Sequence, residues 1–202
     1  IEMRIMNGGS LFSGIGGIDL AFEQAGFKTI WANEIDKYAC ITYRLNFGDD
    51  YLVEGDIQNI PAESVPYADV LVAGFPCQAF SIAGLRKGFD DEKGRGTLFF
   101  ELVRIFKAKK PQIVFLENVK NFEKHDGGKT LARVKKELKD IGYTVHSEVL
   151  CASDYGVPQN RERIIIVGFN KLQSISFVPF LCPAVFWSAI FIKRKQFSFK
   201  LL

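Results

Sequence analysis

The sequence predicts a doubly wound α/β fold, in which a mostly parallel sheet carries helices on both faces and ends in an antiparallel strand. Apolar runs of strand length alternate with segments of helical periodicity as far as residue 150. The last two apolar runs, residues 144–150 and 163–169, are joined without a helix. Parallel strands need a long crossover, so this connection indicates an antiparallel pair. The length of 202 residues suits one domain with a sizeable core.

Turn residues separate the expected elements. Gly26 and Gly142 end two helices, and Pro111 ends a third. The expected strands are a first one that closes at residues 10–13, followed by 29–33, 51–54, 70–73, 113–116, 144–150 and 163–169. The expected helices are residues 17–26, 36–46, 97–107 and 130–141.

The charge of the chain is unevenly distributed. A hydrophobic content of 48% and a charged content of 24% are those of a globular protein. The net charge of +3 comes from residues 170–202, which hold five basic residues and no acidic one. The other 21 basic and 23 acidic residues give residues 1–169 a net charge of −2. If the protein binds nucleic acid, its positive charge must therefore be local.

The cysteines and histidines argue against a metal site. The four cysteines are widely spaced and form no CxxC pair, which argues against a zinc ribbon or a disulfide framework. The two histidines, His125 and His146, are too few and too scattered to bind a metal. We recognise no signal peptide and expect a cytoplasmic protein with reduced thiols and no metal.

A glycine-rich turn, Phe-Ser-Gly-Ile-Gly-Gly at residues 12–17, lies between the first strand and the first helix. It allows close approach of a ligand to the backbone and offers free N–H groups at a helix start. The dinucleotide pattern GxGxxG is not met, because Asp19 occupies its last position. Glu34 ends the second strand and Asp56 follows the third, where they could bind ribose hydroxyls and an adenine amino group. Each carboxylate alone is more often simply solvated, but together they indicate an adenosine-containing ligand without a diphosphate.

Cys77 follows the apolar run 70–73 in the sequence Gly-Phe-Pro-Cys-Gln. Open α/β sheets place their chemistry at the carboxyl ends of strands, and Pro76 stiffens this loop. Glu117 ends the next expected strand, so its carboxyl group should lie beside the thiol. A thiol and a carboxyl group so placed suit addition to a pyrimidine ring. The alternatives are a cysteine that only packs and a glutamate that only caps a helix.

Two further segments could contact a substrate. In extended geometry Gln159, Arg161 and Arg163 share one face, and arginine can bind phosphates or carbonyl oxygens bidentately. An ion-paired strand edge is the alternative. The glycine-rich linker 81–96 is long for a connection between a strand and a helix, which is typical of a lid or of disorder.

Together these segments resemble the DNA cytosine-5 methyltransferases, especially those of bacterial restriction–modification systems. The resemblance covers residues 10–169, and the motifs stand in the family's order. They are FSGIGG, GFPCQAFS, GRGTLFFELVRI, ENV and QNRER.

The resemblance implies a Rossmann-like fold that uses S-adenosylmethionine to methylate carbon 5 of a flipped cytosine in double-stranded DNA. The residues it implies for the cofactor site are Phe12, Ile15, Gly16, Glu34, Asp56, Ile57, Pro76 and Leu98. Those it implies for catalysis are Cys77 as nucleophile, Glu117 on ring nitrogen 3, and Arg161 and Arg163 holding the base and the catalytic loop. Substrate and loop contacts are expected from Gln78, Ser81, Arg95 and Gln159.

The pattern changes after residue 169. The family continues with a target-recognition domain and a final segment that completes the cofactor pocket, and neither is found in the apolar and basic tail 170–202. We expect residues 1–169 to form the catalytic domain. The tail is a truncated or out-of-frame terminus, a membrane segment over residues 175–192, or a docking surface for a second chain. Pro179 and Pro183 argue against the membrane segment.

The function accordingly has alternatives. The chain could be an active DNA methyltransferase, alone or with a partner chain that supplies the recognition domain and the final segment. It could instead be a non-catalytic remnant that binds only the cofactor. The related tRNA methyltransferases are a third possibility, although Phe75 and Ser81 favour DNA.

Overall fold

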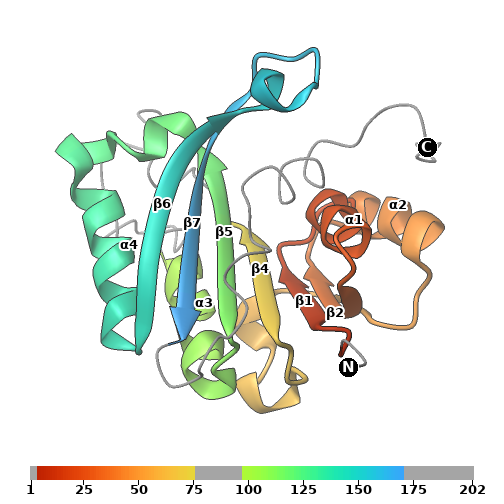
Figure 1. Cartoon of the computed structure of the whole chain (residues 1–202). Helices are drawn as coiled ribbons and strands as arrows, with labels where there is room; N and C mark the ends of the chain where they lie inside the picture. The colour runs from red at the N-terminus through yellow and green to blue at the C-terminus, as the bar shows by residue number, and fades with distance from the viewer. Residues whose placement is uncertain (1–3, 76–96, 171–202) are drawn as a thin grey trace.

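The computed structural model describes residues 4–75 and 97–170 of the chain (Figure 1). Within these ranges seven strands form one sheet in the order β3-β2-β1-β4-β5-β7-β6. The neighbours from β3 to β5 are parallel, whereas β7 runs antiparallel to both β5 and β6. The predicted fold class, including its terminal antiparallel strand, is confirmed.

The elements lie within a few residues of their predicted positions. The strands are β1 (Asn7–Leu11), β2 (Lys28–Glu34), β3 (Leu52–Glu54), β4 (Val70–Gly74), β5 (Ile113–Val119), β6 (Tyr143–Cys151) and β7 (Glu162–Asn170). The α-helices are α1 (Gly17–Gln24), α2 (Lys37–Phe47), α3 (Thr97–Lys109) and α4 (Lys129–Asp140). The described 3-10 helices are η1 (Ile57–Asn59), η2 (Ala62–Ser64), η6 (Lys120–Phe122), η7 (His125–Gly128) and η8 (Ala152–Tyr155).

The sheet is covered on both faces, and β4 shows how its sequence permits this. Leu71 belongs to a buried cluster with Leu102 of α3 and Leu138 of α4. Its neighbour Val72 points to the opposite face and packs in a cluster with Phe22 of α1. Figure 1 shows α1 and α2 near β1 and β2, while α4 runs along β6 at the other edge of the sheet. A continuous apolar run was therefore the correct signal for a strand buried on both sides.

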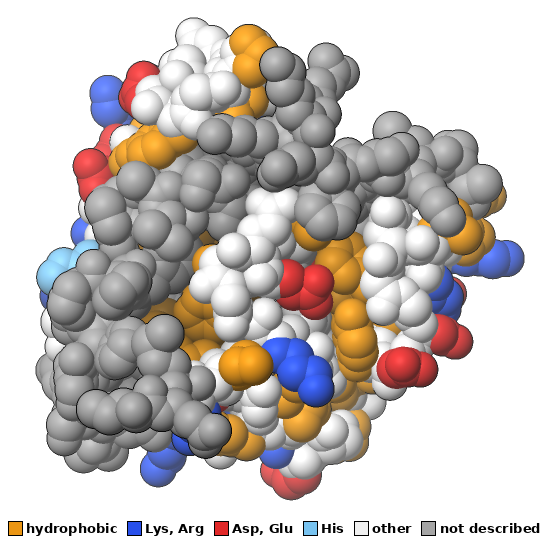
Figure 2. Space-filling view, turned by 45° about the vertical axis from the view of Figure 1, so that its right-hand side comes forward, with side chains coloured by type: hydrophobic (Ala, Val, Ile, Leu, Met, Phe, Trp, Pro, Cys, Tyr) orange, Lys and Arg blue, Asp and Glu red, His pale blue; other side chains and the backbone are white. Residues whose placement is uncertain are grey.

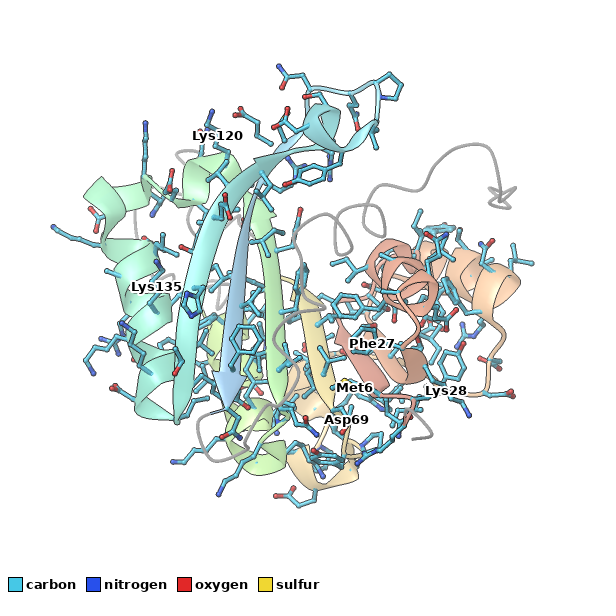
Figure 3. The ribbon with its side chains drawn as sticks, in the orientation of Figure 1. Met6, Phe27, Lys28, Asp69, Lys120 and Lys135 are labelled. Atoms are coloured by element: carbon cyan, nitrogen blue, oxygen red, sulfur yellow. The ribbon has the colours of Figure 1, made fainter. Side chains whose placement is uncertain are left out.

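The amino ends of the central strands are joined by Asp69, which is 1% exposed. Its carboxylate accepts hydrogen bonds from Arg4 at 3.0 Å, from the backbone N–H of Asn7 at 2.8 Å and from Gln112 at 3.0 Å. Figure 3 shows Asp69 at the end of the sheet where the chain also begins. The opposite edge, where the strands have their carboxyl ends, holds the residues expected to be functional. The order of strands reverses between β1 and β4, and such a switch point is where open α/β sheets bind ligands.

Two connections differ in detail from the sequence expectation. Strand β1 ends at Leu11, two residues before the predicted end, because Phe12 has a left-handed backbone with φ of 55°. Between β3 and β4 the alternation of strands and α-helices is interrupted. This connection contains the two 3-10 helices η1 and η2, and Pro61 caps the second of them. Within residues 4–75 and 97–170 no helix is long and apolar enough to cross a membrane.

Candidate active site

The glycine-rich turn begins where β1 ends and leads into α1. Gly14 and Gly16 have positive φ values of 57° and 89°, which side chains rarely adopt. Gly16 is the N-cap of α1, and its N–H donates to the carbonyl oxygen of Ser13 at 3.0 Å. Ile15 between these glycines is 41% exposed. The turn therefore lies at the surface beside the start of a helix, as a ligand-binding loop requires.

Glu34, at the end of β2, connects this turn to the neighbouring strand. Its Oε2 accepts a hydrogen bond from the N–H of Gly14 at 2.7 Å. Its Oε1 accepts from the N–H groups of Ile35 and Asp36, both at 2.8 Å. A carboxylate has about four lone-pair directions, so three bonds leave it able to accept one more, for example from a ribose hydroxyl. Glu34 is buried, and the structure brings it to the predicted place beside the turn.

The expected adenine residues follow β3. One oxygen of Asp56 caps η1 by accepting the N–H of Gln58 at 2.9 Å. The side chain of Ile57 is only 2% exposed and packs in the main hydrophobic core. Any contact of Ile57 with a ligand must therefore come mainly from its backbone. Leu98, near the start of α3, is partly buried against the same core.

Glu117 lies at the carboxyl end of the sheet, as predicted, within β5, which continues to Val119 rather than ending at residue 116. In the parallel pair of β4 and β5 it stands opposite Gly74, three residues before Cys77. A Cβ atom on Gly74 would lie 3.5 Å from Oε2 of Glu117, so the carboxylate lies over the end of β4. Its other oxygen, Oε1, is 2.8 Å from Nε of Arg163 on β7. The predicted proximity of Glu117 to this strand end is thus observed.

Two opposing effects act on the pKa of the Glu117 carboxyl group. Burial raises the pKa of the Glu117 carboxyl above its ordinary value, while the positive charges of Arg163 and Arg161 counteract the rise. The side chains of Glu117 and Arg163 are 21% and 19% exposed, so solvent screens their pairing only partly. A buried carboxyl group whose pKa is shifted in this way is typical of functional sites.

The segment before β7 departs from the prediction of one extended face. Strand β7 begins at Glu162, so Gln159 and Arg161 lie in the preceding turn. Backbone hydrogen bonds from Gln159 to Val157 and from Arg161 to Gln159, at 2.7 and 2.9 Å, fold this turn. Only Arg163 projects from the strand itself. Arg161 is nevertheless near enough for its charge to act on Glu117.

Asn118 is a residue that the sequence interpretation quoted in a motif but gave no role. It is 2% exposed, and its Nδ2 donates to the carbonyl oxygen of Phe75 at 3.2 Å. Its Oδ1 accepts the N–H of Val119 at 2.9 Å. The ring of Phe75 in turn packs edge-on against Phe122, with 5.4 Å between centroids. A buried amide within an apolar strand must be hydrogen-bonded, and that rule was the signal that could have identified this anchor.

Several predicted residues lie outside the described ranges. They are Pro76, Cys77, Gln78, Ser81 and Arg95, together with the whole linker 81–96 and the tail from residue 171. Within residues 4–75 and 97–170, no group of three or more His, Cys, Asp or Glu side chains could hold a metal ion. Figure 2 shows acidic and basic side chains intermixed on the described surface of one face, without a continuous basic field. This distribution agrees with the small net charge of residues 1–169.

Comparison with solved structures identifies the class of fold. A DNMT2 of Spodoptera frugiperda superimposes with a TM-score of 0.71 and 26% identity, covering 86% of this chain and 52% of that chain. The Dnmt2 methyltransferase of S. pombe gives a TM-score of 0.68 with 24% identity, over 83% of this chain and 52% of that chain, and supports the fold alone. The fold is therefore the Rossmann-like fold of methyltransferases.

Sequence comparison then identifies the family. The profile of the C-5 cytosine-specific DNA methylases matches residues 6–200, so the chain belongs to this family. The match extends beyond residues 10–169, on which the resemblance was based. The Type II methyltransferase M.Bsp6I of Bacillus sp. (strain RFL6) is 54% identical over 176 residues, which are 86% of this chain and 55% of that protein. M.HhaI of Haemophilus parahaemolyticus is 48% identical over 183 residues, 91% of this chain and 54% of that protein. The chain thus spans about half the length of these relatives.

Proposed function

We propose that this chain transfers a methyl group from S-adenosylmethionine to carbon 5 of cytosine in DNA, with Cys77 as the nucleophile. The observation that best supports this function is the placement of Glu117 over the end of β4. Its Oε2 lies against Gly74, and its Oε1 is held by Arg163. Cys77 follows Gly74 by three residues, and three residues of chain reach at most about 11 Å, which is compatible with the proposed approach of its thiol to a base bound at this carboxyl group.

The proposed chemistry uses a thiol and a carboxyl group because carbon 5 of cytosine is a poor nucleophile. The Cys77 thiolate adds to carbon 6, and the electron pair of the carbon 5–carbon 6 bond moves into the ring. Glu117 stabilises the product by donating a proton or a hydrogen bond to ring nitrogen 3. Carbon 5 would then take the methyl group from the sulfonium sulfur of the donor, which would leave as a neutral thioether. Transfer of the carbon 5 proton to a base would restore the double bond and release the thiolate. The raised pKa of Glu117 favours the protonated form that this role requires.

The residues at the carboxyl ends of β1, β2 and β3 fit the methyl donor. The turn at Gly14 and Gly16 allows close approach, and Glu34 retains an acceptor direction for a ribose hydroxyl. Asp56 uses one carboxylate oxygen for its own 3-10 helix, so the other could accept from an adenine amino group. We expect Phe12, Ile15, Ile57, Pro76 and Leu98 to complete the walls. The donor would supply an electrophilic methyl group, and these residues would orient it.

The face of a cytosine ring cannot be reached inside a duplex, so we propose that the target base is flipped out. Arg161 lies before β7, close enough for its charge to act on Glu117, and Gln159 lies in the same turn, so both are proposed to hold the base. The residues proposed from the linker are Gln78, Ser81 and Arg95. This chain spans about half the length of its relatives. We therefore propose that it binds DNA either alone or together with a partner chain.

The test is covalent trapping with DNA that contains 5-fluorocytosine, in the presence of S-adenosylmethionine. Fluorine at carbon 5 cannot leave as a proton does, so a competent enzyme stays bonded to its substrate. We expect an adduct with the wild-type chain and none with Cys77→Ala. Cys151→Ala, which removes another thiol at the end of β6, should trap as well as wild type. An adduct that persists in Cys77→Ala would refute the assigned nucleophile. If the wild-type chain binds the donor but forms the adduct with DNA only after a partner chain is added, the chain is one half of a two-chain enzyme.

A further inference from the structure

Arg104, in α3, reaches across to the 3-10 helix that follows β3. Its Nη2 donates to the carbonyl oxygen of Ile57 at 3.1 Å and to that of Ile60 at 2.9 Å. One guanidinium nitrogen carries two hydrogens, so it can serve both acceptors at once. Its Nε is bonded to Glu101 of the same helix at 2.6 Å, which fixes the orientation of the planar group. Hydrogen bonds from a charged donor are stronger than neutral ones.

A second side chain, that of Asn33, binds the backbone immediately before Asp56. Asn33 of β2 is 1% exposed, and its Nδ2 donates to the carbonyl oxygens of Val53 at 3.0 Å and Gly55 at 2.9 Å. Asp56 thus lies between carbonyl groups bound by Asn33 and carbonyl groups bound by Arg104. The backbone that presents Asp56 is therefore determined by β2 and α3 together.

The simpler alternative is that Arg104 only connects a helix to a loop and has no role in ligand binding. The same helix offers a matched example, because Nζ of Lys109 donates to the carbonyl oxygen of Glu63 in η2 at 2.9 Å. Arg104 differs in two respects. It binds two carbonyls with one oriented group, and one of them belongs to Ile57, next to the carboxylate expected to meet the adenine. A shift of this backbone would move the Asp56 carboxylate, whereas a shift at Glu63 would not.

We propose that Arg104 is a positioning residue for adenine recognition, because it fixes the backbone of residues 57–60 and with it the carboxylate of Asp56. The inference rests on the proposed donor site. It also makes the adenine preference of that site depend on α3, the helix that follows the linker from Cys77. Lysine should not replace Arg104, since a flexible ammonium group lacks the planar geometry that binds both carbonyls at once.

The first test compares binding of S-adenosylhomocysteine and S-inosylhomocysteine by calorimetry. Inosine carries a carbonyl oxygen where adenine carries an amino group, so it cannot donate to Asp56. We expect the wild-type chain to prefer the adenine ligand by roughly tenfold, the factor that corresponds to one hydrogen bond to a charged group. Arg104→Lys should lose most of this preference, and Lys109→Met should keep it. Equal weakening of both ligands in Arg104→Lys would mean a merely structural role and would overturn the inference.

The second test needs no ligand. Hydrogen exchange of the backbone amides of Gln58, Asn59 and Ile60 should become several-fold faster in Arg104→Lys and stay unchanged in Lys109→Met. Unchanged exchange would refute the fixing of this backbone. If exchange responds but the wild-type chain binds neither ligand, the proposed donor site is wrong and the adenine inference fails with it. A second variant is available if Arg104→Lys does not fold. Glu101→Gln removes the carboxylate that orients Arg104, and we expect it to reproduce both effects in weaker form.

Discussion

Arg163 and Glu117 meet diagonally across the antiparallel pair of β5 and β7. The residue directly opposite Arg163 is Val119, and the residue opposite Glu117 is Ile165, so the two side chains are offset by two positions. Nε of Arg163 nevertheless comes within 2.8 Å of Oε1 of Glu117. Diagonal pairs of this kind are within reach of long side chains. The approach leaves Oε2 of Glu117 directed at the end of β4.

The first prediction concerns the catalytic coupling of this pair. If Glu117 acts in the proposed methyl transfer, Arg163→Met should lower kcat/KM for DNA methylation by roughly 10²-fold or more, because an oriented charged donor beside this carboxyl group is lost. Glu117→Gln should be at least as damaging. The double variant should lose much less than the product of the two single effects, since both changes disrupt the same interaction. Fully multiplicative losses in steady-state kinetics would show that the two residues act separately.

The second prediction concerns the pKa of Glu117. Burial raises this pKa, and the positive charge of Arg163 is the largest effect that opposes the rise. Arg163→Met removes the opposing charge, so the pKa should move further up and the protonated form should persist to higher pH. Arg163→Lys keeps the positive charge and should change the pKa of Glu117 less than Arg163→Met does. The measurement is a pH titration of the Glu117 carboxyl carbon by NMR with labelled glutamate, assigned with Glu117→Gln. A lower pKa in Arg163→Met would contradict the electrostatic account.

Features determined by strand order were predictable from the sequence. Strands β4 and β5 are consecutive buried strands, and in a doubly wound sheet such strands are neighbours, so the place of Glu117 beside Gly74 could be inferred without coordinates. The approach of Cys77 to this carboxyl group stays a prediction, because Cys77 lies outside the described residues. The glycine turn and Glu34 follow the same logic, because both lie at carboxyl ends of adjacent strands.

Side-chain contacts between elements far apart in the sequence were not predictable. The bond between Asn118 and Phe75, the reach of Arg104 to Ile57 and the contact of Tyr43 with Asp19 all join residues separated by 24 to 47 positions. Periodicity reports which face of an element is apolar, but it does not report which polar atom a buried amide or carboxyl group will meet. The turn at Gln159 was mispredicted for a related reason, since strand geometry was extended past the residue where pairing begins.

The third prediction concerns Asp19, a buried carboxyl group at the start of α1. Burial raises its pKa from 3.8 to about 6, although the hydroxyl of Tyr43, 3.1 Å from Oδ1, opposes the rise. The folded state thus binds the proton more tightly than the unfolded state. The stability that this proton contributes is complete below pH 3.8 and is lost as the pH rises through about 6. At 1.36 kcal/mol per unit, the loss is about 3 kcal/mol.

Asp19→Asn cannot titrate, so its free energy of unfolding should lack this decline between pH 4 and pH 6. Tyr43→Phe should have the opposite effect to Asp19→Asn and enlarge the decline. Loss of the Tyr43 hydroxyl raises the pKa of Asp19 further, so the free energy of unfolding should continue to fall at higher pH. Urea denaturation at a series of pH values measures both effects. Parallel pH curves for wild type and Asp19→Asn would show that this carboxyl group does not titrate in the range.

The fourth prediction separates backbone strain from crowding in the glycine turn. A Cβ atom on Gly16 would lie within 3 Å of several ring carbons of Phe47, and φ of 89° disfavours any side chain there. A left-handed backbone costs a non-glycine residue about 1–2 kcal/mol, and overpacking costs about 1–3 kcal/mol more. Gly16→Ala should therefore destabilise the fold by roughly 2–5 kcal/mol in urea denaturation. The adjacent Gly17 has no atom within 4 Å of its Cβ position and is the matched control.

Gly17→Ala should change the free energy of unfolding by less than about 1 kcal/mol, because alanine is tolerated in the first turn of a helix. The two contributions at Gly16 can be distinguished by changing the ring that it meets. Phe47→Leu makes room for the methyl group, so Gly16→Ala should cost less in that background than in wild type, by the part due to crowding. The part due to positive φ should remain, since it depends only on the backbone of residue 16. Equal costs in both backgrounds would mean that Phe47 moves aside freely and that strain alone requires glycine at this position.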